Sequence, residues 1–171
     1  MHESVRLRTY QPTDLPSVLA LNNESVPAVN ELDAAEVARL AGLAEHALVA
    51  EVVGEEEQFA GFCWVMGPGQ PYASLNYRWF SERYEHFVYL DRIAVSPAFR
   101  RYGIGRGLYQ ELIRRFSGVT PVLLCEVNVR PPNEASLRLH AALGFREVGR
   151  QDTDGGTKTV SLLELALDVS R

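Results

Sequence analysis

The alternation of apolar and polar residues predicts strands near both ends of the chain and in its first half. "SVRLRTY" at residues 4–10 alternates and predicts a first strand. "HALVAEVVG" and "QFAGFCWVMG", at residues 46–54 and 58–67, enclose the acidic stretch "EEE" and predict an antiparallel hairpin. "FREVGRQ" and "KTVSLLELAL", at residues 145–151 and 158–167, predict a last hairpin around "DTDGG".

Two central segments are more continuously apolar, and a helical pattern lies between them. "FVYLDRIAV" at residues 87–95 and "PVLLCEVNV" at residues 121–129 predict strands, the second buried on both faces. The pattern over residues 103–116 predicts a helix, because four apolar residues recur at intervals of four: Ile104, Leu108, Leu112 and Phe116. A strand, helix and strand in this order predict a parallel crossover.

The remaining helices are predicted from their boundaries. A short helix is expected from Thr13 to about Leu21, and Asp33 with Glu36 form a capping box that opens another helix. Residues 131–143 predict a helix that has two prolines at its entrance and ends at Gly144. The segment 68–86 contains Gly, Pro and many aromatic residues and is expected to be irregular.

The resulting order of elements is β-α-α-β-β-β-α-β-α-β-β. It predicts an α/β (α+β) fold with a mixed, mostly antiparallel sheet of about six or seven strands and helices on both faces. The length of 171 residues suits one domain, 1–171, with a sizeable core.

Composition narrows the class of protein. Apolar residues make up 46% of the chain and charged residues 23%, as in ordinary soluble proteins. No apolar run is long enough for a membrane helix, and the N-terminus lacks an apolar signal core, so we expect a cytoplasmic protein without membrane contact. The net charge of −5 argues against a nucleic-acid binder. Cys63 and Cys125 are expected to be reduced and buried, with no metal site.

The stretch "RRYGIGRG" at residues 100–107 stands between a predicted buried strand and a predicted helix. Glycines let a ligand approach the backbone, and the first N–H groups of a helix have no partner within it. Together with the arginines they favour bound phosphate. The spacing matches neither G-x-G-x-x-G nor G-K-[ST], and a turn that serves only packing is the alternative.

The segment "DRIAVSPAFRRYGIGRGLYQEL" resembles the acyl-CoA-binding motif of the GNAT acetyltransferase superfamily, with Arg100, Gly103 and Gly105 at its key positions. A second segment, "NEASLRLHAALGF", is similar to a further family pattern through four residues: Asn133, Ser136, Gly144 and Phe145. The resemblance covers the chain coarsely and residues 87–146 specifically. It implies a GNAT-like sheet with a splayed central strand pair and direct acetyl transfer from acetyl-CoA to an amine.

The resemblance also implies which residues bind acetyl-CoA. The pyrophosphate would rest on backbone N–H groups of residues 101–106, and the pantetheine arm on the preceding strand. The residues so assigned are Ile93, Ala94, Val95, Arg100, Arg101, Tyr102, Gly103, Ile104, Gly105, Arg106, Asn133, Ser136 and His140. A plain helix N-cap is the alternative for Asn133.

The catalytic candidates are His140 and three carboxylates. His140 stands where many family members carry the tyrosine credited as general acid, and members resembling phosphinothricin acetyltransferases have histidine there. It is predicted either to protonate the departing thiolate or only to pack beside the cofactor. Asp91, Glu126 and Glu24 are candidate general bases, the last expected in the loop between the first two helices. The alternative for each is a salt bridge, for example with Arg92 or Arg130.

The segment "PYASLNYRWFSERYEHF" at residues 71–87 is predicted to be a lid over the acceptor, with a covered sheet edge or a dimer contact as alternatives. The expected acceptor contacts are Tyr77, Trp79, Arg83, Tyr89 and Asn128. A small-molecule amine, of an amino-acid-like kind, is the first hypothesis for the acceptor. The alternatives are a protein N-terminus or lysine, and a non-catalytic domain that senses acyl-CoA. Pairing into a homodimer is left open.

Overall fold

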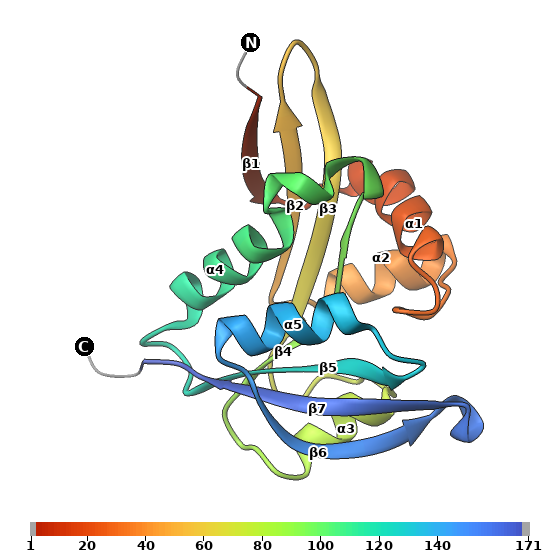
Figure 1. Cartoon of the computed structure of the whole chain (residues 1–171), viewed down its shortest axis with the longest axis vertical. Helices are drawn as coiled ribbons and strands as arrows, with labels where there is room; N and C mark the ends of the chain where they lie inside the picture. Colours follow the sequence, from red (N-terminus) through yellow and green to blue (C-terminus); the bar gives the residue numbers. More distant parts are fainter. Residues whose placement is uncertain (1–2, 169–171) are drawn as a thin grey trace. The chain divides into compact units, whose positions relative to one another are not determined.

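The computed structural model describes residues 3–168, and in them seven strands follow one another in the sheet order β1-β2-β3-β4-β5-β7-β6 (Figure 1). The strands are β1 (Ser4–Thr9), β2 (His46–Val53), β3 (Glu57–Met66), β4 (Val88–Val95), β5 (Val122–Arg130), β6 (Arg146–Thr153) and β7 (Lys158–Ala166). β4 pairs with β5 in parallel, whereas β1 with β2, β2 with β3, β5 with β7 and β6 with β7 are antiparallel. The predicted mixed, mostly antiparallel sheet is therefore confirmed.

The helices agree with the sequence pattern except in one segment. The α-helices among the described residues are α1 (Leu15–Glu24), α2 (Ala34–Leu43), α3 (Leu75–Ser81), α4 (Ile104–Phe116) and α5 (Glu134–Leu143). Short 3-10 turns are η1 (Pro12–Asp14), η2 (Pro97–Tyr102) and η3 (Asp154–Gly156). Helix α3 lies in the segment expected to be irregular, and that expectation was wrong. None of the helices within residues 3–168 is long and apolar enough to cross a membrane.

The described chain divides into two compact units. The first, residues 3–66 and 91–112, holds β1–β3, the last five residues of β4, helices α1 and α2, and most of α4. Helix α1 packs against α2 and β3. The predicted capping box of α2 is confirmed, because Asp33 accepts a hydrogen bond from Glu36 N–H and Glu36 accepts one from Asp33 N–H.

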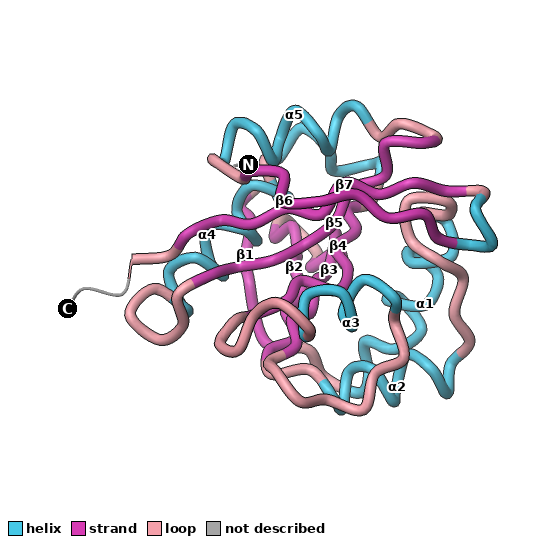
Figure 2. Tube along the Cα trace, turned by 90° about the horizontal axis from the view of Figure 1, so that it is seen from below, coloured by secondary structure: helices cyan, strands magenta, loops and turns pink. Residues whose placement is uncertain are grey.

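The second unit comprises residues 67–90 and 113–168. In it, the start of β4 pairs with β5 through Val88 with Leu123 and Tyr89 with Leu124. Helices α5 and α3 cover opposite faces of this part of the sheet (Figure 2). The first four residues of β5 are buried, as its apolar sequence predicted.

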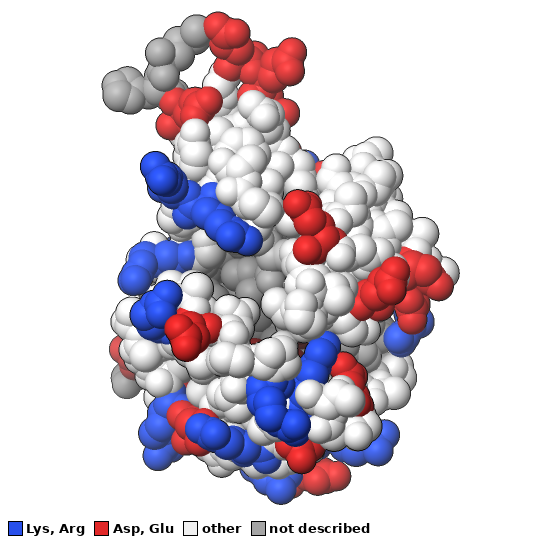
Figure 3. Space-filling model, turned by 45° about the vertical axis from the view of Figure 1, so that its right-hand side comes forward, with Lys and Arg blue, Asp and Glu red and all other residues white. Residues whose placement is uncertain are grey.

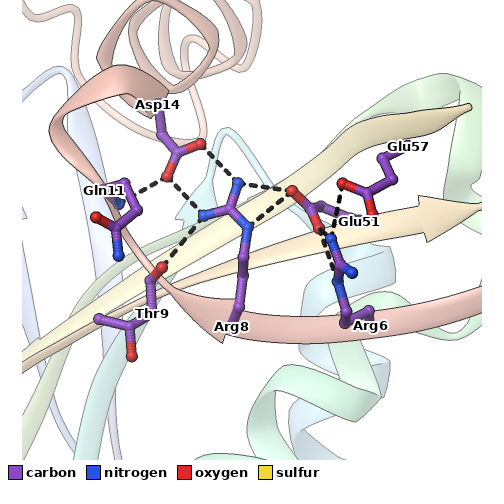
Figure 4. Close-up of polar contacts among 7 residues, drawn as sticks. All are labelled: Arg6, Arg8, Thr9, Gln11, Asp14, Glu51 and Glu57. Carbon is purple, nitrogen blue, oxygen red and sulfur yellow. Dashed lines mark hydrogen bonds and ion pairs between the residues drawn. The ribbon is translucent and has the colours of Figure 1, made fainter.

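An ion network joins β1 and β2 to η1 in the first unit (Figure 4). Arg8 Nε donates to Glu51 at 2.7 Å, and its two terminal nitrogens each donate to Asp14 at 2.8 Å. Arg6 donates to the same Glu51. Burial alone raises the pKa of Glu51, but the hydrogen bonds from Arg8 and Arg6 outweigh it, so this pKa lies below its usual value. Hydrogen bonds from Arg8 also lower the pKa of Asp14.

We predict that Glu51→Gln lowers the free energy of unfolding by about 2 kcal/mol at pH 7, because charge-assisted hydrogen bonds at a buried carboxylate are lost. A carboxyl whose folded pKa is depressed contributes stability above its unfolded pKa of about 4, and that contribution is lost as the pH falls through the lower folded value. The Tm difference between wild type and variant should therefore shrink between pH 5 and about pH 3.

Glu57→Gln is the matched control. Glu57 also pairs with Arg6, at 2.8 Å, but its side chain is 56% exposed, against 8% for Glu51. Exposed pairs contribute little, so this variant should change Tm only slightly. A Tm difference for Glu51→Gln that does not depend on pH would contradict the assignment.

Candidate active site

The glycine-rich turn in the first unit has the geometry of an anion site. The η2 turn ends at Gly103, whose φ of 68° lies in the left-handed region, and α4 begins at Ile104. The first helical hydrogen bond runs from Gly107 N–H to Gly103 C=O at 2.9 Å. The N–H groups of Ile104, Gly105 and Arg106 therefore precede the helical bonds, at the positive end of the helix dipole.

There is room at this turn for a phosphate group. A Cβ atom built at Gly103 or Gly107 meets nothing within 4 Å. Arg100, Arg101 and Arg106 are exposed around it, so their guanidinium groups can reach an anion in solvent. The residues present thus fit the pyrophosphate of coenzyme A, with no bulk on the approach to the backbone.

Tyr102, another predicted cofactor residue, is engaged elsewhere. Its hydroxyl donates to the carboxylate of Glu3, and this hydrogen bond raises the pKa of the phenol. Tyr102 is therefore held on the side of the N-terminal strand, and the backbone and arginines are left as the anion-binding groups.

Acidic side chains gather at a different place in the same unit. The tip of the β2–β3 hairpin carries Glu55, Glu56 and Glu57, all exposed, and Figure 3 shows acidic groups clustered at that end of the molecule. Elsewhere on the face in view, basic and acidic groups are interspersed. The turn is thus a local basic site in a chain whose overall charge is negative.

The strand leading to the turn is anchored by residues that the sequence analysis did not single out. Ser96 N–H donates to Ala60 C=O at 2.8 Å. A Cβ atom at Gly61 would lie 2.8 Å from the carbonyl oxygen of Ala94, and real Cβ atoms essentially never come so close to a backbone oxygen. The available signal was a glycine inside the apolar strand "FAGFC", which often marks a bulge or a close backbone approach.

Asp91, a candidate base, lies in a buried ion pair. Its carboxylate accepts hydrogen bonds from Arg92 Nε at 2.9 Å and Trp64 Nε1 at 2.8 Å, and both charged side chains are 3% exposed. Arg92 also donates to Asn22 and Asn30. The salt bridge with Arg92, given above as the alternative, is confirmed, and this pairing leaves Asp91 poorly placed to take a proton.

Glu24 is the second candidate whose expected position needs correction. It is the last residue of α1, not a loop residue, because the helix continues three residues beyond the expected end at Leu21. Its side chain is exposed to solvent.

Glu126 lies in the second unit and is bound by a tyrosine. The hydroxyl oxygen of Tyr89 lies 2.7 and 2.8 Å from the two carboxylate oxygens of Glu126, which share its one O–H donor. Tyr89 is fully buried, whereas Glu126 is half-buried. The neighbouring Asn128 uses its backbone carbonyl to accept from Asn133 N–H. Tyr89 therefore fixes the orientation of a carboxylate that remains partly accessible to solvent.

The aromatic segment predicted as a lid packs within the second unit. The rings of Tyr77 and Phe80, both on α3, lie 5.6 and 5.7 Å from the ring of Tyr89. Tyr77 is 3% exposed, and its hydroxyl donates to Gly67 C=O. This ring cluster holds Tyr89 in place, so Tyr77 supports the site and is too deeply buried to form its surface.

Trp79 packs the same helix against the last hairpin, and Arg83 covers the Trp79 ring. A Cβ atom at Gly149 of β6 would lie 2.6 Å from the Trp79 ring, and Arg83 stacks 3.8 Å above that ring. The hydroxyl of Tyr84, just after this helix, donates to the carboxylate of Glu164 on β7. Burial is the larger cause and this hydrogen bond the second cause that raise the pKa of Tyr84 to about 12. Because β6 is an edge strand, the covered sheet edge given above as an alternative describes this segment better than an open lid.

His140 is a buried, neutral imidazole. It lies on α5, 3% exposed, and its Nδ1 is 2.6 Å from the carbonyl oxygen of Ser136, a contact that requires a proton on Nδ1. Burial lowers the pKa of His140, and the hydrogen bond to Ser136 offsets this only in part. A neutral ring with its proton on Nδ1 has a lone pair on Nε2, so His140 has no proton to donate from Nε2 at neutral pH.

Asn133 and Gly144 mark the ends of α5, as the motif predicted. The Asn133 side chain accepts from Ser136 N–H at 3.3 Å, which makes it the N-cap. Gly144 ends the helix with a φ of 96°. The alternative role of Asn133 as a cap is thus confirmed, and Ser136 contacts His140 through its hydroxyl at 3.2 Å as well as through its carbonyl.

Solved structures with the same fold are numerous. The chain is similar to the ribosomal-protein-alanine N-acetyltransferase of Brucella melitensis, with 25% identity, a TM-score of 0.70, and 95% and 99% of the two chains covered. For Arabidopsis thaliana NAA60, solved with a bisubstrate analogue, the identity is 18%, the TM-score is 0.75, and 98% of this chain and 100% of that chain are covered. For a phosphinothricin acetyltransferase from Sinorhizobium meliloti, solved with AcCoA, the identity is 23%, the TM-score is 0.70, and 96% of this chain and 89% of that chain are covered. A comparison with curated protein sequences found no match.

The family model described as "Acetyltransferase (GNAT) family" matches residues 15–145, which include the glycine-rich turn, Glu126 and His140. This match spans most of the chain and agrees with the sheet order and the helix-terminal anion site. The chain therefore belongs to the GNAT acetyltransferase family, and it is an enzyme whose acetyl donor is acetyl-CoA.

Proposed function

We propose that the chain is an N-acetyltransferase that transfers the acetyl group directly to a primary amine, with Glu126 as general base. The observation that carries this proposal is the contact between Tyr89 and Glu126, in which one buried hydroxyl binds both carboxylate oxygens. An amine is protonated near neutral pH and must lose a proton before it attacks. A fixed, half-buried carboxylate is suited to accept that proton, directly or through water.

The other two carboxylates lack this combination of order and access. Asp91 is 3% exposed and paired with Arg92, so protonating it would leave a buried guanidinium uncompensated. Glu24 is exposed at the end of α1. Of the three carboxylates proposed from the sequence, Glu126 alone is both oriented by a neighbouring residue and partly accessible.

Acetyl-CoA supplies an activated acetyl group on a thiol, and a thiol with a pKa of about 8.5 is a good leaving group as the anion near neutral pH. In the first unit, the backbone of residues 103–106 and the exposed Arg100, Arg101 and Arg106 would hold its pyrophosphate. Ile93, Ala94 and Val95 would bind the pantetheine arm through the backbone of β4. Asn133 and Ser136 keep the supporting role of fixing α5 and the His140 ring.

We propose a positioning role for His140 in place of the general acid suggested by the family motif. Its lowered pKa keeps the ring neutral, and its Nδ1 proton is used by Ser136. A ring in this state accepts a hydrogen bond and fills space beside Phe145, whose ring centre is 5.1 Å away.

The acceptor that we propose first is a small-molecule amine, as the sequence suggested. The similarity to a phosphinothricin acetyltransferase supports this choice. A peptide N-terminus is the second candidate, supported by the likeness to a ribosomal-protein-alanine N-acetyltransferase. The aromatic residues of helix α3 pack against Tyr89 and β6 and do not argue against a peptide acceptor. A cytoplasmic location and a homodimer stay predictions.

We predict that the purified chain releases free thiol from acetyl-CoA when one class of amine is present. The panel should contain amino acids, polyamines, aminoglycosides, and short peptides with free or blocked N-termini. Release with a small amine supports the first candidate, and release only with free N-termini supports the second. Thiol release that does not depend on any amine would contradict amine acetylation.

We predict that Glu126→Gln lowers the rate of acetyl transfer about 100-fold or more at pH 7, the usual contribution of general-base catalysis. Glutamine keeps an oxygen to accept from Tyr89 but cannot take a proton. The deficit should shrink as the pH rises to the pKa of the acceptor amine, because the amine then needs no base. Single-turnover rates from pH 6 to 10 measure this.

Glu85→Gln, an exposed carboxylate in the same unit, is the control for loss of charge. It should leave the rate and its pH dependence unchanged. A rate deficit for Glu126→Gln that is constant across the pH range would exclude the role of base.

We predict that Gly103→Asp weakens acetyl-CoA binding at least tenfold more than Gly103→Asn. Both side chains tolerate the left-handed conformation at φ 68°, and they differ only in charge. A carboxylate at the helix N-terminus would repel the pyrophosphate, and added salt would reduce the difference. Isothermal titration calorimetry at two salt concentrations tests this, and equal affinities of the two variants would rule out an anion site at the turn.

A further inference from the structure

We propose that Gly61, on β3, is a positioning residue that sets the backbone of β4 and α4 for acetyl-CoA. This inference rests on the cofactor site proposed above, and it assigns a role to a residue outside the glycine-rich motif. All the groups involved, from β3 to the start of α4, lie in the first unit.

A bulge in β3 stands opposite β2 at this position. Ala50 pairs with Gly61, but the next residue of β2, Glu51, pairs with Phe59, so Ala60 is the extra residue. A bulged residue is left out of the ladder between its two strands. The carbonyl of Ala60 instead accepts from Ser96 N–H, the first residue after β4. The bulge thus ties β3 to the point where the cofactor strand becomes the η2 turn.

Gly61 lies next to that bond and touches the parts of the proposed site. Its absent Cβ would lie 2.8 Å from Ala94 C=O, 3.4 Å from Val95 Cα, and 3.4 Å from Ile104 Cγ2. Ala94 and Val95 belong to the strand assigned to the pantetheine arm, and Ile104 opens the helix assigned to the pyrophosphate. In Figure 1, η2 follows β4, lies beside the first half of β3 and leads into α4. One glycine therefore sets the spacing of strand and helix together.

A methyl group at Gly61 would force a rearrangement that a side chain cannot absorb. The closest atom is a backbone oxygen, so β4 must shift by several tenths of an ångström, and its N–H and C=O groups shift with it. Catalytic and binding geometries are sensitive to displacements of this size. The expected result is weaker binding of acetyl-CoA by a protein that is still folded.

The alternative is that Gly61 serves only to pack the sheet. Packing alone would lower Tm in Gly61→Ala without changing the affinity of the folded protein for acetyl-CoA. Affinity measured by calorimetry on the folded fraction separates the two roles, because positioning changes Kd and packing does not.

We expect Gly61→Ala to raise the Kd for acetyl-CoA about tenfold, given the steep cost of small misplacements. Gly42→Ala is the matched control, because Gly42 lies in α2 and a Cβ atom there meets nothing within 4 Å. The Kd of the Gly42→Ala variant for acetyl-CoA should equal that of wild type. A Kd for Gly61→Ala equal to that of wild type, at any Tm, would overturn the inference.

A second pair of variants tests the same anchor without a new side chain in the sheet. Ser96 has φ −56° and ψ 133°, which proline adopts, so Ser96→Pro removes the N–H that donates to Ala60. Ser96→Ala keeps that N–H. We expect Ser96→Pro to raise Kd severalfold and Ser96→Ala to leave it unchanged. If Gly61→Ala does not fold, equal Kd values for these two variants overturn the inference.

The outcome can be told apart from failure of the proposed cofactor site. If Gly103→Asp and Gly103→Asn bind acetyl-CoA equally, the pyrophosphate assignment fails and the inference about Gly61 fails with it. If the Gly103 pair differs while Gly61→Ala and Ser96→Pro bind as wild type does, the cofactor site stands and the positioning role alone is wrong. Weaker binding by Gly61→Ala and Ser96→Pro, with both controls unchanged, supports the role.

Discussion

The close approach of two backbones at Gly61 is the constraint on which the cofactor side of the first unit depends. The carbonyl oxygen of Ala94 lies close to where a Cβ atom of residue 61 would be. The carbonyl of Ala60, the extra residue of the bulge, accepts a hydrogen bond from Ser96 N–H. These contacts determine where β4 ends, and the end of β4 determines where η2 turns and α4 starts. Because the anion site is made of backbone N–H groups, the positions of its hydrogen-bond donors depend directly on the position of this backbone.

In the second unit, packed side chains rather than backbone contacts hold the proposed catalytic group in position. Aromatic rings from α3 surround Tyr89, and Tyr89 in turn holds Glu126 by its hydroxyl. Rings have few rotatable bonds, so a packed cluster fixes the position of a hydroxyl at low entropic cost. Helix α3 is itself fixed by Trp79 against Gly149 and by Tyr84 on Glu164. A segment with no catalytic residue of its own thereby orders the proposed base.

Local patterns in the sequence predicted the strands, the crossover helix and both ends of α5, because periodicity and capping depend on neighbours a few residues apart. They did not predict α3, whose seven residues are stabilised by aromatic packing against distant strands. The glycine-rich turn could be located from its motif, yet its anchor at Gly61 could not. The contact joins residues more than thirty positions apart, and a single glycine in a strand has several explanations. For Asp91, the sequence supplied the right partner in Arg92 but could not show that both side chains are buried.

The protonation state of His140 connects the fold to the proposed chemistry. Its ring is buried, its Nδ1 proton is bound by Ser136, and burial lowers its pKa, so charging the ring would require a desolvated cation. The proton that leaves the amine has a less costly destination in the carboxylate of Glu126, which is half-buried and oriented by the Tyr89 hydroxyl. A base that gains a proton and a histidine that stays neutral imply that the enzyme supplies a proton acceptor for the amine and no imidazolium donor from His140. An imidazolium acid would cause activity to fall at high pH, and a histidine that is already neutral at pH 7 does not produce this fall.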